Sequence, residues 1–171
     1  MAMMEMDLKQ KLELAKDRRT PTHILMELSK DDDERVRYYV AWNFSTPEEA
    51  LIKLADEEHW MIREAVAKHY NVPREILEKL ARDPHYAVRI QVARNPYATR
   101  NIMWWLAHDK EWIVRREVAI NAKGRDDISL RLLSKDECDF VLVEVARNIF
   151  TPKPEKEMLK AKGIHFDLMC S

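Results

Sequence analysis

Glycine is the residue that this sequence lacks most: Gly124 and Gly163 are its only two glycines among 171 residues. An average domain contains about 7% glycine. The Rossmann fingerprint, the P-loop and the nucleophile elbow all need clustered glycines, so these three motifs are excluded. Hairpin-rich β folds are disfavoured as well, because their tight turns use residues with positive φ. The scarcity of glycine therefore predicts an all-α protein.

Cysteines and long apolar runs are also few. Cys138 and Cys170 are isolated in the sequence, which indicates neither a disulfide framework nor a metal-binding knuckle and is typical of a reducing compartment. No run approaches the roughly 18 apolar residues of a membrane-spanning helix. Residues 1–7 are acidic and lack the apolar segment of a signal sequence. We therefore expect a cytoplasmic protein with no membrane partner.

An excess of one charge is missing too, since 29 Lys and Arg residues balance 30 Asp and Glu residues and give a formal net charge of −1. This balance argues against nucleic-acid binding through overall charge. A balanced total does not exclude a local basic face, so the charges have to be mapped along the chain.

What the sequence does contain is a 26-residue repeat. Leucines recur with this period, and a single 27-residue interval separates Leu106 from Leu133. Three further rows keep the register: a Val or Ile eight residues after each of the first five leucines, a Val four residues later, and an Ala directly after that. Such aligned rows indicate stacked helical repeats, an α-solenoid. The leucines are Leu28, Leu54, Leu80, Leu106, Leu133 and Leu159.

Each repeat is interpreted as two short helices. The first opens with a pair such as Thr46-Pro47, in which a capping residue precedes a proline that the first helical turn tolerates. An acid-rich turn follows, placed to cap the second helix. The second helix carries the Val and Ala rows, and we expect an asparagine in the left-handed conformation to end it. These asparagines are Asn43, Asn95, Asn121 and Asn148.

The repeats predict one α-solenoid domain over residues 1–171. Residues 1–19 form an N-terminal cap with a helix over residues 3–17, and residues 20–151 hold about five two-helix repeats. Residues 152–171 form a half-repeat cap and a tail, with Gly163 ending the last helix and residues 164–171 folding over the last repeat.

The repeated phrase resembles a known repeat family. The phrase reads Leu-Ala-x-Asp, then Val-Arg-x-x-Val-Ala-x-Asn-Pro, then Thr-Pro-x-x-x-Leu. It is similar to the leucine-rich repeat variant family and, more loosely, to HEAT repeats, over roughly residues 20–160. The resemblance implies a right-handed superhelix of paired helices, in which the short helix of each repeat is either α or 3₁₀-like, and a binding or scaffolding role. The founding type of the family carries a cysteine-ligated iron–sulfur segment, but no cysteine precedes Cys138 here, so we expect no cofactor.

A row of arginines follows the Val/Ile row by one residue. On a helical wheel it lies close to the buried valine direction, and every repeat supplies an acidic residue in its turn. We therefore predict a structural ladder of Arg–carboxylate pairs rather than a phosphate-binding row. The ladder comprises Arg37, Arg63, Arg89 and Arg115 with Asp31, Glu57, Asp83, Asp109 and Asp136.

A column of possible metal ligands lies five residues after each of the first five leucines. Equivalent residues on stacked helices are about 8–10 Å apart, whereas zinc bonds are about 2.0–2.3 Å long. We therefore predict neither a metal site nor a catalytic thiol in this column. It consists of Asp33, His59, His85, Glu111 and Cys138.

The second helices present a basic and apolar face opposite the valine row. At positions 7, 10 and 14 after each of the five leucines, five residues are basic, one is acidic and nine are apolar or aromatic. Such a composition is typical of interaction surfaces, although burial against the protein itself or a second copy is an alternative. In HEAT-like solenoids, which the repeats resemble, second helices line the concave side. The candidate binding residues are Arg35, Tyr38, Trp42, Lys68, Ile90, Arg94, Arg116, Ile120 and Arg147.

Two functions agree with these features. The first is a non-catalytic interaction module whose concave face binds an acidic or amphipathic protein segment, because the sequence assembles no acid, base and nucleophile set. The second is a nucleic-acid-binding or DNA-repair protein resembling the HEAT-like alkylpurine glycosylases, which cradle DNA in a basic groove that bears tryptophan. A chromophore-lyase-like HEAT protein is a third alternative, for which Cys138 and Cys170 give little support. We expect no small-molecule cofactor for the interaction module.

Overall fold

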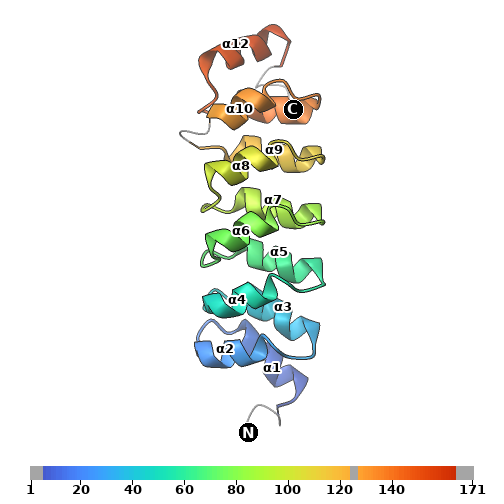
Figure 1. Ribbon diagram of the computed structural model, residues 1–171, viewed down its shortest axis with the longest axis vertical. Helices are drawn as coiled ribbons and strands as arrows, with labels where there is room; N and C mark the ends of the chain where they lie inside the picture. The colour runs from blue at the N-terminus through green and yellow to red at the C-terminus, as the bar shows by residue number, and fades with distance from the viewer. Residues whose placement is uncertain (1–5, 124–126, 165–171) are drawn as a thin grey trace, which may run out of the picture. The chain divides into compact units, whose positions relative to one another are not determined.

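The computed structural model describes residues 6–123 and 127–164, and every regular element in these ranges is an α-helix (Figure 1). The chain divides into two compact units, Met1–Tyr97 and Ala98–Ser171. Within each unit, consecutive helix pairs pack as in an α-solenoid, which confirms the predicted fold class. No helix in the described ranges combines the length and the apolar character that crossing a bilayer requires.

In the first unit, each longer helix contacts the next longer helix along the chain, and each shorter helix contacts the longer one that follows it. The longer helices are α1 (Leu8–Lys16), α3 (Glu34–Trp42), α5 (Trp60–Lys68) and α7 (Tyr86–Arg94). The shorter helices are α2 (Thr22–Leu28), α4 (Glu48–Leu54) and α6 (Arg74–Leu80).

The second unit continues the alternation. The longer helices α9 and α11 contact each other, α8 packs against α9, α10 packs against both α9 and α11, and α12 packs against α11. These helices are α8 (Arg100–Leu106), α9 (Trp112–Asn121), α10 (Asp127–Leu133), α11 (Asp139–Arg147) and α12 (Lys153–Ala161). The shorter member of each pair is α-helical over seven residues, so of the α and 3₁₀ forms that the resemblance left open, the structure has the α form.

The four aligned apolar rows form the core. Every residue of the leucine, Val/Ile, valine and alanine rows is at most 2% exposed. Burying one such leucine or valine side chain stabilises the fold by about 2 kcal/mol. All four rows are therefore buried as the repeat predicted, and apolar residues of the shorter helices such as Leu25, Leu51 and Leu77 complete the core.

The first helix is shorter than predicted at its start. Asp7 is the N-cap residue of α1, because its carboxylate accepts from the Gln10 N–H at 2.8 Å while the Gln10 side chain accepts from the Asp7 N–H at 3.0 Å. This capping box starts the helix at Leu8, and residues 1–5 lie outside the described ranges. At the other end, Gly163 has a φ of +79° directly after α12, as predicted for a helix end. Of the predicted tail, only Ile164 is described.

The threonines of the Thr-Pro pairs do not cap the helices that follow them. Pro47 itself is the N-cap residue of α4, and it makes no side-chain bond there. The Thr46 hydroxyl instead donates to the Val40 carbonyl in the last turn of α3. Thr20 and Thr151 donate in the same way to carbonyls six residues earlier. Each threonine thus satisfies a carbonyl at the end of the preceding helix.

The asparagines at the ends of the second helices are not left-handed, so that prediction is wrong. Asn43 has a φ of −79°, and no non-glycine residue in the described ranges has a positive φ. The Asn43 amide donates to the Ala15 and Asp17 carbonyls at 2.8 and 2.9 Å, and its oxygen accepts from the Ser45 N–H at 3.0 Å. Asn95 and Asn148 repeat this pattern two and four helix pairs later. The side chain therefore joins one helix end to the previous one.

Asn121 departs from the pattern because α9 is one residue longer than the other second helices of the repeats. Its amide donates to the Glu117 carbonyl inside α9, and Ala122 is the C-cap residue. The Asn148 amide accordingly reaches the Ala122 carbonyl at 2.9 Å. The extra residue of the 27-residue interval therefore lies in α9.

His69 occupies the asparagine position at the end of α5. Its Nε2 lies 3.0 Å from the Asn43 carbonyl oxygen, and its Nδ1 accepts from the Asn71 N–H at 3.0 Å. These two bonds require a neutral ring that carries its proton on Nε2. The residue is 2% exposed, and burial lowers the pKa of the imidazole, an effect that the bond to Asn43 only partly offsets.

We predict that His69 makes the fold sensitive to acid. Because its pKa in the folded chain lies below the ordinary value of about 6.5, its contribution to stability is present above that pH and is lost as the pH falls toward the folded pKa. The slope is at most about 1.4 kcal/mol per pH unit, the limit for one proton. Urea unfolding of His69→Asn between pH 7 and 5 should show a smaller loss than wild type. His23→Asn, at an exposed site on α2, is the control, and equal losses in wild type and His69→Asn would refute the assignment.

Candidate binding surface

Three arginines of the row pair with the acidic turn of the following helix pair. The Arg63 guanidinium donates two bonds to Asp83 at 2.6 and 3.0 Å, and Arg115 donates two to Asp136 at 2.6 and 2.9 Å. Arg37 binds Glu57 in the same bidentate way at 2.9 and 3.0 Å. The third guanidinium nitrogen of each arginine donates to carbonyls of its own turn. Each arginine therefore ties two turns together.

The remaining ladder residues make the following bonds. Asp31 binds Lys11 of α1 at 2.7 Å. Arg89 is buried and donates to the Asp83 and Pro84 carbonyls at 2.8 and 3.1 Å. Asp109 accepts from the Glu111 N–H at 2.9 Å.

Asp136 shows the electrostatic consequence of the ladder. Burial alone would raise the pKa of its carboxyl, but bonds from the Arg115 side chain and the Cys138 N–H hold that pKa below its ordinary value. The same pairing raises the pKa of Arg115. The ion pair is therefore intact at neutral pH.

The column of possible metal ligands is a column of helix N-caps. Asp33, His59 and His85 each accept a bond from the backbone N–H two residues on, at 2.9, 3.3 and 3.3 Å. Glu111 and Cys138 hold the same N-cap position without a side-chain bond. Among the described residues, no cluster of three His, Cys, Asp or Glu side chains is arranged to hold a metal ion. These residues start the second helices.

Aromatic rings stack beside these N-caps in the first unit. The Trp60 and His85 rings are 4.0 Å apart and inclined by 10°, and the stack continues to Tyr86 at 5.1 Å from His85. His59 lies 6.4 Å from Trp60 on the other side. The stack therefore joins the start of α5 to the start of α7.

The nine predicted binding residues do not behave alike. Ile90 is only 9% exposed and belongs to the core, so its assignment to the surface is wrong. Arg35 pairs with its own N-cap residue Asp33 at 2.6 Å, and that guanidinium lowers the pKa of Asp33 to about 2. In the second unit, Arg116 and Arg147 lie 2.6 and 3.9 Å from the Glu144 carboxylate, and Ile120 is 42% exposed. Arg94 is exposed at the end of α7.

Tyr38, Trp42 and Lys68 form a different arrangement on α3 and α5. The Lys68 ammonium lies 3.8 Å from the centre of the Trp42 ring, and the Tyr38 ring lies 6.4 Å from that of Trp42. Burial raises the pKa of the Tyr38 hydroxyl, and a hydrogen bond with Trp42 lowers it in part. Cations over aromatic faces are stabilised by the ring quadrupole.

Two further cations, in the last turn of α1 and just after it, also lie over aromatic rings. The Lys16 ammonium is 4.1 Å from the Tyr39 ring centre, and the Arg18 guanidinium is 4.8 Å from that of Phe44. A pocket of about 340 Å³ opens between the ends of α1 and α3, and none of its lining residues is acidic. We call the following residues the aromatic–cationic surface: Lys16, Arg18, Tyr38, Tyr39, Trp42, Phe44 and Lys68.

The sequence interpretation missed Lys16, Arg18, Tyr39 and Phe44. The first two lie in and after the cap helix, which was left out of the projection of the repeats. Aligning the cap helix with the repeats would have found Lys16, because it lies one repeat period before Trp42. Arg18 lies one period before Phe44, at a position that was not projected. Tyr39 and Phe44 lie at positions 11 and 16 after Leu28, outside the three projected positions.

No protein-family model and no curated protein matches this chain. The relation to leucine-rich repeat variants and HEAT repeats therefore stays a prediction from the repeated phrase.

We predict that the buried Arg63–Asp83 pair contributes far more to stability than an exposed pair. Arg63→Met leaves Asp83, whose side chain is 4% exposed, without its cation and should lower the free energy of unfolding by about 3 kcal/mol. Arg74→Met removes the partner of Glu78 from an exposed pair on α6 and should cost below about 1 kcal/mol. Urea unfolding followed by circular dichroism measures both, and similar losses would show that the ladder is not structural.

Proposed function

We propose that this chain is a non-catalytic binding module of the leucine-rich-repeat-variant or HEAT-like type, whose aromatic–cationic surface binds an acidic segment of a partner protein. Its setting would be the cytoplasm, which the isolated thiols Cys138 and Cys170 support. No small-molecule cofactor is needed for this function.

The observation that supports the proposal best is the set of three cations over aromatic rings. Lys16, Arg18 and Lys68 lie 4.1, 4.8 and 3.8 Å from ring centres, and all three side chains are exposed. The pocket between α1 and α3 is lined by Lys16 and Arg18 and by no carboxylate. An incoming carboxylate therefore meets positive charge from the lining side chains, and the rings offer the large, rigid contacts that are typical of binding hot spots.

The distribution of charge favours a protein segment over a nucleic acid. A nucleic acid requires a row of cations that follows successive phosphates. On this chain, Arg35 is paired with Asp33, and Arg116 with Glu144. Glu64 also lies on the face of the second helices, where it accepts from Gln91. Two cations of the aromatic–cationic surface, Lys16 and Arg18, line one pocket, and the third, Lys68, lies over Trp42 on the next longer helix.

The test is a selection of peptides from a random library displayed on phage, with the full chain as bait. The variant K16E/R18E/K68E reverses the three cations, and K30E/K53E/K79E reverses three exposed lysines on or beside the first helices as the matched control. Wild type and control should enrich Asp and Glu in the selected peptides, whereas K16E/R18E/K68E should not, because its surface repels carboxylates.

Two outcomes would overturn the proposal. One is the same peptide composition for wild type and for K16E/R18E/K68E. The other is binding of single-stranded or duplex DNA, measured by fluorescence anisotropy, that K16E/R18E/K68E abolishes and that exceeds binding of any selected peptide. Circular dichroism of each variant establishes that its helices are intact.

A further inference from the structure

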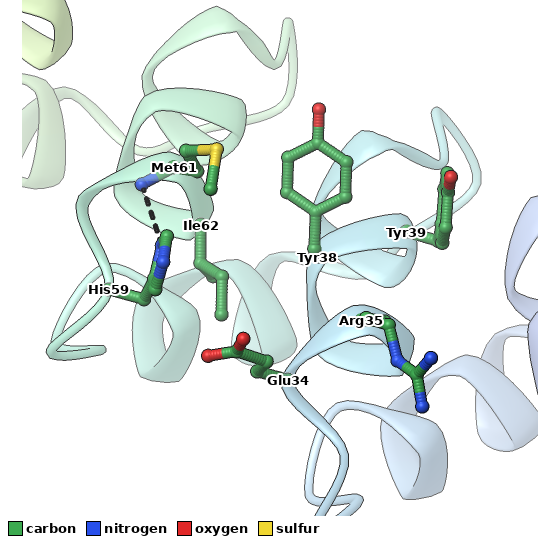
Figure 2. A pocket seen from close by; sticks show the side chains of 7 residues that line it. All are labelled: Glu34, Arg35, Tyr38, Tyr39, His59, Met61 and Ile62. Atoms are coloured by element: carbon green, nitrogen blue, oxygen red, sulfur yellow. Dashed lines mark hydrogen bonds between the residues drawn. The ribbon is translucent and has the colours of Figure 1, made fainter.

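A second pocket lies next to the aromatic–cationic surface, between the first halves of α3 and α5. It encloses about 270 Å³. Figure 2 shows Tyr38 of α3 facing Met61 of α5 across it, with Ile62 and Glu34 below them. The Arg35 guanidinium points away from Met61 in this view, toward its partner Asp33 at 2.6 Å. The pocket walls that face each other are therefore apolar.

The pocket also has an exposed entrance. Met61 is 40% exposed, whereas its two neighbours in the pocket wall, Ile62 and Tyr38, are more buried. An exposed methionine beside an aromatic ring is an adaptable apolar wall. A volume of about 270 Å³ accommodates one large side chain and is below the usual range of about 300–1,000 Å³ for small-molecule sites.

The two pockets lie on either side of α3 and share two residues. Tyr38 and Tyr39 line both of them. Arg35 lines the α3–α5 pocket and Trp42 lines the α1–α3 pocket. The two residues are seven positions apart on α3, which is about 10 Å along the helix axis at 1.5 Å per residue. An extended chain covers that distance in about three residues.

The chemistry of the two pockets differs. The α3–α5 pocket has one carboxylate, Glu34, and its one guanidinium, Arg35, is already paired with Asp33, so its charge does not favour a carboxylate ligand. The α1–α3 pocket has Lys16 and Arg18 and no acid. An apolar side chain therefore suits the α3–α5 pocket, and a carboxylate suits the α1–α3 pocket.

We propose that the partner segment runs along α3 in an extended conformation, with an aromatic or large aliphatic side chain in the α3–α5 pocket and a carboxylate at the α1–α3 pocket about three residues away. This inference rests on the proposed function and names the motif that the surface reads. The spacing follows from the length of α3 between the pockets, and the order of the two groups follows from their charge.

The test uses labelled peptides in which one Trp and an Asp pair are adjacent, three residues apart or eight residues apart, joined by Gly and Ser. Anisotropy titrations with the full chain should give the tightest binding at three residues, by about tenfold. Met61→Ser should weaken the three-residue peptide by about tenfold and leave the same peptide with Ser for Trp unchanged. Ile52→Ser on α4 is the control, because Ile52 is 39% exposed and Met61 is 40% exposed.

The outcomes separate this inference from the proposed function. Equal affinity at all spacings, or an equal effect of Met61→Ser and Ile52→Ser, overturns the two-pocket motif, while acid-dependent binding lost in K16E/R18E/K68E would still support the proposed function. If the wild-type chain binds no peptide in an acid-dependent way, both the two-pocket motif and the proposed function are overturned. Circular dichroism of Met61→Ser establishes that a weaker affinity does not come from unfolding.

Discussion

Contact between neighbouring helix pairs is the constraint on which this structure depends. Its helices have seven to ten residues, which is too short for stability in isolation, and each has one apolar side that a single pair leaves uncovered. The Leu, Val and Ala rows are buried only because the next pair covers them. Every other feature of the fold serves to hold the pairs in register.

Polar side chains at the turns supply that register. On one side the arginines join successive acidic turns, and on the other the Asn43-type amides and His69 join successive helix ends. Both kinds of bond satisfy backbone or carboxylate groups that would otherwise be buried unpaired. At these helix ends, asparagine satisfies carbonyl groups through side-chain hydrogen bonds, whereas other helices often end with a glycine in the left-handed conformation. The scarcity of glycine is a consequence of this arrangement.

The sequence predicted the core well because burial follows a strict repeat period. It failed where a side chain's role depends on the neighbouring pair: the amide of Asn43 and the hydroxyl of Thr46 bind carbonyls that only stacking or the preceding helix brings near. In the candidate site, projection found Tyr38, Trp42 and Lys68 but also included Ile90, which is buried. A single helical wheel cannot show which side chains a neighbouring helix covers. Lys16 was missed because the cap helix was not aligned with the repeats, and Arg18, like Phe44, lies at a position outside the projected face.

Amide chemical-shift mapping tests most directly whether an acidic segment binds along α3. The probe is the full chain, labelled with nitrogen-15 and titrated with the peptide that carries Trp and an Asp pair three residues apart. The account predicts shifts concentrated at the end of α1, along α3 and at the start of α5, with α2, α4 and α6 little changed. Shifts centred on α2, α4 and α6, or on the second unit, would contradict it.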